Sequence, residues 1–223
     1  MSLASQLVDL IAALLLLTSF AMLAQRRLTA LVDLLTLQGA LLTTATLLAA
    51  WSTGHAHLYL SALLSLVLKV VVLPTLLRRL VRRLDLQWDR EALVNTPTTM
   101  LVGIVLVIIA FNLALPISAL SGTILRGALG IALASVLLAF LMMITRRKAV
   151  SQVIGFLAME NGLFFAATSV TYGMPMVVEL GIALDVLVGA FVFGIFFFRI
   201  RETFDSLDTR HLESRPVGEA EDA

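Results

Sequence analysis

Long apolar runs, separated by short polar stretches, follow one another along most of the chain. Seven runs have the length of about 20 residues that a helix needs to cross a bilayer. A proline, Pro116, is expected to stop the fourth run, and the segment 172–175 is expected to turn the chain before the last one. The approximate bounds of the seven predicted spans are 3–23, 29–51, 57–77, 98–115, 124–145, 149–171 and 176–198.

Composition supports this interpretation. The chain is 60% hydrophobic and 14% charged, whereas charged residues make up about 25% of a typical soluble domain. The first run starts at Leu3 without a preceding basic region or a small-residue cleavage site, so it is expected to be a span rather than a signal peptide. The predicted fold class is all-α, a polytopic membrane helix bundle of about seven transmembrane helices.

The basic residues are distributed very unevenly between the two sides that alternating loops would define. Of the 16 basic residues, only Lys69 and Arg126 fall outside the loops and helix ends of one side. The positive-inside rule makes the basic side cytoplasmic. We therefore expect the N-terminus outside and the C-terminus in the cytoplasm.

The spans also suggest how the chain is organised. Gln38-Gly39 in the second span is similar to Asn161-Gly162 in the sixth, which is a weak sign of duplication. The expected units are a three-helix membrane unit at 1–81, a cytoplasmic polar loop at 82–97, a linking transmembrane helix at 98–117, a second three-helix unit at 118–200 and a cytoplasmic polar tail at 201–223.

Three ionisable residues lie deep inside apolar runs. At 1.5 Å per helical residue, Glu160, Asp185 and Lys69 lie roughly 18, 21 and 13 Å from the basic side. An ionisable group at this depth costs about 2.5–3.5 kcal/mol on insertion scales, and proton or ion relay is a leading reason for its presence. Lys69 is a natural partner for one of the carboxylates. The alternative is a structural ion pair that only fixes packing.

Two further acids are candidates for the same relay. Asp33 lies within about 9 Å of the basic side and can reach toward lipid headgroups. Glu179 is six residues before Asp185 and could continue a path outward. Asp9, near the outer end of the first span, is expected to be interfacial.

Other chemistry has little support in the sequence. There is no cysteine, which excludes disulfides and cysteine-ligated iron–sulfur clusters in this chain. His55 and His57 form a pair without the further ligands that a metal site needs. We expect no catalytic, cofactor-binding or metal-ligating residues.

The sequence resembles the hydrogenase-4 component E family, which supplies a membrane subunit of group 4 nickel–iron hydrogenase and formate hydrogenlyase complexes. The most specific resemblance lies in the last third of the chain. The segments that carry it are 17–19, Gln38, 69–74, 154–162, 178–185 and 204–212.

The last three spans are also similar to the K subunit of respiratory complex I, a three-helix protein with an acid in each of its last two helices. Asp185 matches the acid of the last helix by position. In the family the other acid follows a helix glycine by two residues, whereas Glu160 follows Gly155 by five. A shift of three keeps roughly the same helix face.

The resemblance implies an accessory subunit without a redox centre of its own. Its partners would be antiporter-like membrane subunits and a peripheral hydrogenase-type arm that carries the nickel–iron centre and the iron–sulfur clusters. The location would be the bacterial inner membrane, with the lipid bilayer as the surrounding solvent.

Two other classes remain open from the residues alone. A stand-alone proton- or cation-coupled secondary transporter is the main alternative, although no span is clearly broken and no inverted repeat is evident. A seven-span receptor or retinal protein fits the expected topology. Retinal would need a Schiff-base lysine, and the only buried one is Lys69 in the third span.

Overall fold

The computed structural model describes residues 3–54, 56–83, 95–119, 125–171, 181, 183–191 and 194. Every element in these ranges is a helix, and residues 183–191 are helical as well. The elements are α1 (Leu3–Ala24), α2 (Leu28–Thr53), α3 (Ala56–Leu66), the π-helix η1 (Val67–Val72), α4 (Leu73–Arg83), α5 (Thr96–Ala119), α6 (Leu125–Thr145) and α7 (Ala149–Thr171).

Within the described residues, six helical stretches are long and apolar enough to cross a membrane. One of them, Leu58–Arg83, runs through α3, η1 and α4 without interruption. The chain is thus an all-α, multi-pass membrane protein. The seventh predicted span, 176–198, lies only partly in the described ranges, where its residues 181, 183–191 and 194 are helical.

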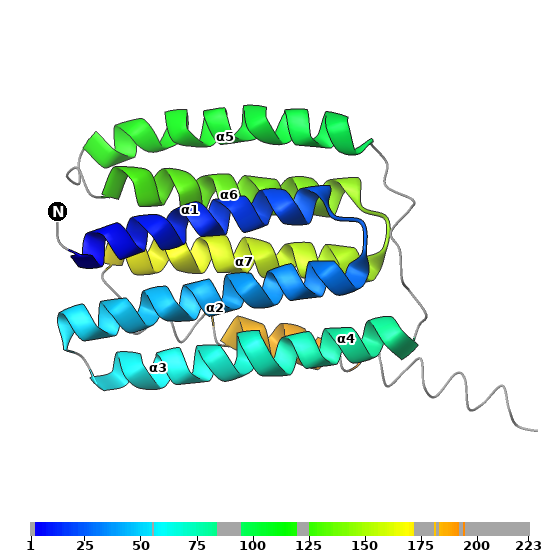
Figure 1. Cartoon of the computed structure of the whole chain (residues 1–223), viewed down its shortest axis with the longest axis horizontal. Coiled ribbons are helices and arrows are strands. Elements are labelled where there is room, and N and C mark those ends of the chain that lie inside the picture. Colours follow the sequence, from blue (N-terminus) through cyan, green and yellow to red (C-terminus); the bar gives the residue numbers. More distant parts are fainter. Residues whose placement is uncertain are drawn as a thin grey trace, which may run out of the picture.

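The helices lie side by side with their long axes nearly aligned (Figure 1). α6 packs against α7, α5 and α1, and α2 packs against α1, α3 and α7. α5 and the α3–α4 stretch therefore form opposite outer sides of the bundle (Figure 1). This arrangement places α2 beside the middle of the α3–α4 stretch, between that stretch and α1.

The bundle has an apolar interior and an apolar exterior. Leu28, Leu31, Leu77 and Ile154 are fully buried in one core cluster. Large apolar side chains also point outward, among them Leu60, Leu101 and Leu187. An exterior of this kind is expected where lipid rather than water surrounds the protein.

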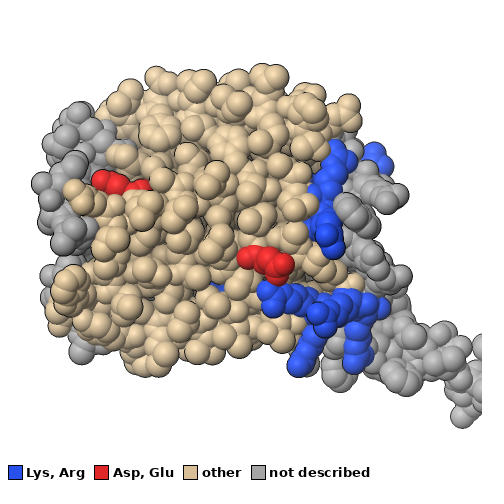
Figure 2. Space-filling model, viewed as in Figure 1, with Lys and Arg blue, Asp and Glu red and all other residues tan. Residues whose placement is uncertain are grey.

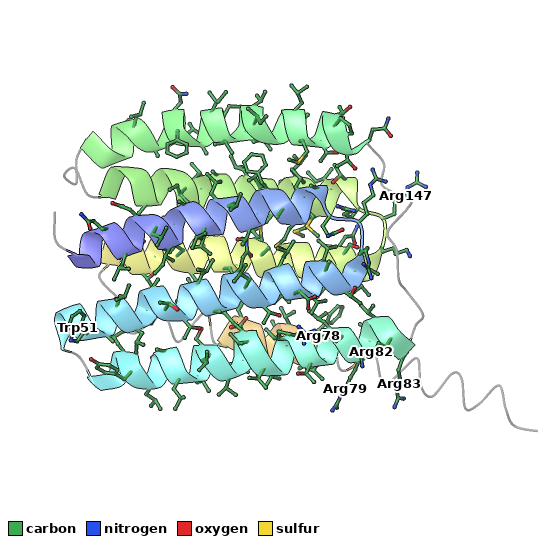
Figure 3. The ribbon with its side chains drawn as sticks, in the orientation of Figure 1. Trp51, Arg78, Arg79, Arg82, Arg83 and Arg147 are labelled. Carbon is green, nitrogen blue, oxygen red and sulfur yellow. The ribbon has the colours of Figure 1, made fainter. Side chains whose placement is uncertain are left out.

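Positive charge gathers at one end of the bundle, which we call the basic end (Figure 2). Figure 3 shows Arg78, Arg79, Arg82, Arg83 and Arg147 at this end and Trp51 at the other. The turns between α1 and α2 and between α6 and α7 lie at the basic end as well (Figure 1). This grouping of the described basic residues agrees with the one-sided distribution expected from the sequence.

Two side chains hold the turn between α1 and α2. Arg146 Nη2 donates to the carbonyl oxygens of Leu23 and Gln25 at 3.0 and 2.6 Å. The Gln25 Oε1 atom accepts hydrogen bonds from the backbone N–H groups of Arg26 and Arg27. These bonds satisfy backbone groups that a helix end leaves without partners.

The part of α5 that is apolar enough to cross a membrane ends at Pro116, as expected, although the helix itself continues to Ala119. Proline cannot donate the hydrogen bond to the carbonyl group four residues earlier. Only the last turn of α5 follows Pro116, so little of the helix depends on the missing bond. The predicted polar tail, 201–223, and most of the predicted polar loop lie outside the described residues.

Candidate functional site

Lys69 lies on the only π-helical segment among the described residues, η1. The hydrogen bond from the Leu73 N–H to the Leu68 carbonyl has the five-residue spacing of a π-helix. Such segments are rare and occur frequently at functional sites. Lys69 is therefore a candidate functional residue for two reasons, the π-helical backbone on which it lies and its buried charge.

Gly39 of α2 lies directly against this segment. A Cβ atom at Gly39 would be 2.9 Å from the Cβ of Lys69 and 3.1 Å from its carbonyl oxygen. Both distances are too short for an ordinary contact. Only a glycine lets the two backbones approach this closely, so Gly39 determines where the base of the Lys69 side chain lies.

The Lys69 ammonium group bridges two carboxylates from two other helical segments. Its Nζ atom lies 2.8 Å from Glu160 Oε1 of α7 and 2.8 Å from Asp185 Oδ1 of the segment 183–191. The three residues are buried, with exposures of 4%, 5% and 0%. We call Lys69, Glu160 and Asp185 the buried charge cluster.

The residue count places the backbone of Lys69 nearer the basic end than the two acids. Its ammonium group nevertheless contacts both carboxylates. Side chains on a helix lean toward the helix N-terminus. The N-terminus of the α3–α4 stretch lies away from the basic end, since Arg78 and Arg83 follow Lys69 toward that end (Figure 3). The long side chain therefore extends inward to the depth of the acids.

The charges in the cluster do not balance when all three groups are ionised. One ammonium group and two carboxylates give a net charge of −1. An uncompensated charge away from water costs several kcal/mol, and one added proton makes the cluster neutral. The arrangement is therefore suited chemically to taking up and releasing a single proton.

An aromatic ring and a glycine complete the surroundings of the ammonium group. Lys69 Nζ lies 5.9 Å from the centre of the Phe164 ring, within the range of a cation–π contact. A Cβ atom at Gly181 would be 2.6 Å from a ring carbon of Phe164 and 3.7 Å from Glu160 Oε1. Gly181 thus allows the segment that carries Asp185 to lie close to α7.

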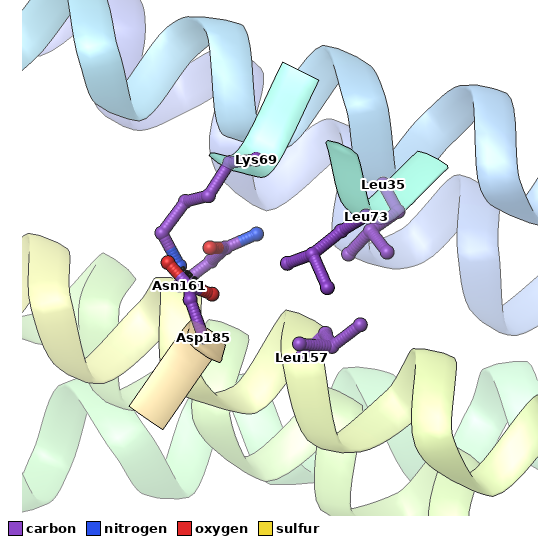
Figure 4. A pocket seen from close by; sticks show the side chains of 6 residues that line it. All are labelled: Leu35, Lys69, Leu73, Leu157, Asn161 and Asp185. Carbon is purple, nitrogen blue, oxygen red and sulfur yellow. Dashed lines mark hydrogen bonds and ion pairs between the residues drawn. The ribbon is translucent and has the colours of Figure 1, made fainter. Parts of the chain in front are cut away.

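Polar side chains near the cluster did not stand out as candidates in the sequence. Asn161, next to Glu160, is 3% exposed and lines a small cavity beside Lys69 and Asp185 (Figure 4). Gln38, next to Gly39, is buried and donates from Nε2 to Ser19 Oγ at 2.9 Å. Uncharged polar residues are common in membrane helices. The signals for these two in the sequence were their positions inside apolar runs and the similarity of Gln38-Gly39 to Asn161-Gly162.

The remaining predicted relay residues lie elsewhere. Asp33 of α2 accepts a hydrogen bond from Arg78 Nη2 at 2.7 Å, and these side chains are 63% and 45% exposed. The pair lies at the basic end, apart from the cluster. Asp9, which was expected to be interfacial and not part of the relay, is exposed near the start of α1. Glu179 lies outside the described residues.

Replacing Gly39 with alanine is expected to displace Lys69. The added methyl group overlaps the Lys69 backbone, and such overpacking typically costs about 1–3 kcal/mol. The thermal stability of the purified variant in detergent, compared with the unaltered protein, checks this result. Gly127→Ala of α6 is the matched control, because a Cβ atom there meets nothing within 4 Å. Equal stability of the two variants would contradict the close approach of Gly39 to Lys69.

Comparison with known proteins gives a full-length relative. The uncharacterized protein Rv0085 of Mycobacterium tuberculosis is 38% identical over 206 residues, which cover 92% of this chain and 93% of that protein. The chain belongs to the same family as Rv0085. No protein-family model matches the chain, and no solved structure matches it.

A second group of relatives has a descriptive name. Hydrogenase-4 component E of Escherichia coli K12 is 25% identical over 146 residues, which cover 66% of this chain and 68% of that protein. The protein of the same name from Shigella flexneri matches to the same extent. The similarity to hydrogenase-4 component E therefore extends over about two thirds of this protein and of the Escherichia coli protein.

Proposed function

We propose that this protein is a membrane subunit of a hydrogenase-related complex and that its buried charge cluster takes part in proton translocation. The observation that carries the proposal is the Lys69 ammonium group held by two buried carboxylates. Lys69 and Glu160 lie in helices long and apolar enough to cross a membrane, and Asp185 lies in the helical segment 183–191. Ionisable groups inside a membrane are costly and mark ion and proton pathways. The similarity to hydrogenase-4 component E supplies the kind of complex.

In this proposal the chain takes part in proton transfer, and its partner subunits carry out the electron transfer. A peripheral hydrogenase-type arm would carry a nickel–iron centre and iron–sulfur clusters. Antiporter-like subunits of a complex I-related membrane arm would adjoin the bundle in the bacterial inner membrane. The cluster would take up a proton from one side and release it toward the other as its charge balance changes.

A stand-alone cation- or proton-coupled transporter is the second candidate. The observation in its favour is η1, where the continuous helix of this span changes from α-helical to π-helical geometry at the charged residue. Transporters often place their ion sites where a membrane helix departs from regular geometry. A purified single chain in liposomes that moves protons against a cation gradient would favour this candidate.

Purification from the native membrane in mild detergent tests the main proposal. A tag at the C-terminus would retrieve the protein, and mass spectrometry with metal analysis would identify what accompanies it. We expect antiporter-like chains together with nickel- and iron-containing subunits. A chain that purifies alone, monodisperse and without such partners would contradict membership in the complex.

A further inference from the structure

A small cavity lies against the buried charge cluster. Its volume is about 10 Å³, and three polar residues, Lys69, Asn161 and Asp185, line it together with Leu35, Leu73 and Leu157 (Figure 4). A cavity needs roughly 10–15 Å³ of this kind of volume to hold one water molecule. The space therefore matches a single water and nothing larger.

The polar atoms around the cavity have bonding capacity to spare. Asp185 Oδ2 and Asn161 Oδ1 are buried and have no hydrogen-bond partner among the described residues. A lysine ammonium group has three N–H donors, and the contacts with Glu160 and Asp185 account for two of them. Leaving a buried polar atom without a partner costs about 1–3 kcal/mol.

We propose that this cavity is a binding site for one water molecule, held by Lys69, Asn161 and Asp185. The water would donate its two hydrogens to Asp185 Oδ2 and Asn161 Oδ1 and accept the third hydrogen of the Lys69 ammonium group. Buried waters typically make about three hydrogen bonds, which is the number offered here. Asn161 supplies the second acceptor at the cavity, without which a water there would have only Lys69 and Asp185 as partners.

The number of available ligands favours water over a metal cation at this position. The cavity offers two unpartnered oxygen atoms among the described residues, Asp185 Oδ2 and Asn161 Oδ1, whereas Ca²⁺ and Mg²⁺ take about six or more oxygen ligands. A neutral water can donate to the two acceptors and still accept from the ammonium. The ligand that the chemistry selects is therefore neutral, with two donors and one acceptor.

The leucines show on which side of the cluster the water lies. Leu35 is two residues beyond Asp33, Leu73 is five residues before Arg78, and Leu157 lies between Glu160 and the basic-end start of α7. All three leucines are thus between the cluster and the basic end. If the cluster transfers protons, a step that rests on the proposed function, this water is the first group to exchange a proton with the cluster on the side of the basic end. The three leucines separate the water from that end.

A cryo-EM or crystallographic map of the protein in its complex, at a resolution that shows ordered waters, tests the site. We expect one density feature within hydrogen-bonding distance of Asn161 and Asp185. The feature is expected to disappear in Asn161→Leu, which keeps a similar size but removes the acceptor. Ser135→Ala on α6 is the control. It deletes a buried side-chain oxygen that likewise has no hydrogen-bond partner among the described residues, and Ser135 does not line this cavity.

Two outcomes would overturn the inference. One is a map of the unaltered protein that shows other buried waters but no density feature beside Asn161 and Asp185. This outcome requires no variant. The other is a feature that persists in Asn161→Leu. Density in the resting protein does not depend on turnover, so the water site can fail while proton coupling stands, and coupling can fail while the water is present.

Discussion

Replacing Lys69 with methionine is expected to lower the free energy of unfolding by about 3–5 kcal/mol, the usual cost of removing one partner of a buried ion pair. Methionine retains much of the volume of the side chain but leaves Glu160 and Asp185 facing each other without a cation. The melting temperature in detergent and the amount of protein that reaches the membrane would both fall. Both can be measured on the tagged chain.

Two further variants separate charge from packing. Arg79→Met removes a positive charge from the exposed basic end and is expected to change stability by less than about 1 kcal/mol. Combining Lys69→Met with Glu160→Gln and Asp185→Asn removes all three charges and is expected to restore much of the lost stability. If Lys69→Met were as stable as Arg79→Met, the ammonium group would not compensate the carboxylates.

Glu160→Gln and Asp185→Asn are each expected to leave assembly intact and to reduce proton transfer by about 100-fold, the range in which positioned acid–base groups act. Either change leaves one ammonium and one carboxylate, which balance without an exchangeable proton. Membrane vesicles that contain the complex, with a pH-sensitive dye and a measured electron flux, give the ratio of protons moved to electrons transferred.

Asp9→Asn is the matched control for these two variants. It also removes one acid from a predicted span, but Asp9 is exposed near the end of α1 opposite the basic end. Its proton-to-electron ratio should equal that of the unaltered protein. Normal ratios in both Glu160→Gln and Asp185→Asn would leave only the structural interpretation of the cluster.

The helices could be predicted from the sequence because each one is a long apolar run, and lipid-spanning helices need little else. The depth of Glu160 and Asp185 followed from counting residues to the basic end. The same residue count gave the depth of Lys69, and from this depth we expected Lys69 to pair with one of the two acids. The geometry that brings it to both acids depends on the direction in which its side chain leans and on the close approach of Gly39, which a residue count does not include.

Other features of the site left a weaker trace in the sequence. Asn161 carries no charge, so it was noted only for the similarity of Asn161-Gly162 to Gln38-Gly39 and as part of the segment 154–162, not as a site residue. The segment 67–72 is a run of valines and a leucine around Lys69, and this composition is equally compatible with a regular α-helix. Asp33 looked like a possible relay residue, and its pairing with Arg78 required knowledge of how α2 and α4 pack.

The π-helical turn also affects how this chain should be aligned with its relatives. A regular α-helix advances about 100° per residue, and a π-helical turn uses up roughly one extra residue for the same rotation. A relative that lacks one residue between 67 and 72 can therefore keep the same faces on both sides with an uninterrupted α-helix. A one-residue gap placed elsewhere in this span would instead turn either Lys69 or Leu77 away from the bundle. Alignments of this family should accept a gap at this turn before any other position in the helix.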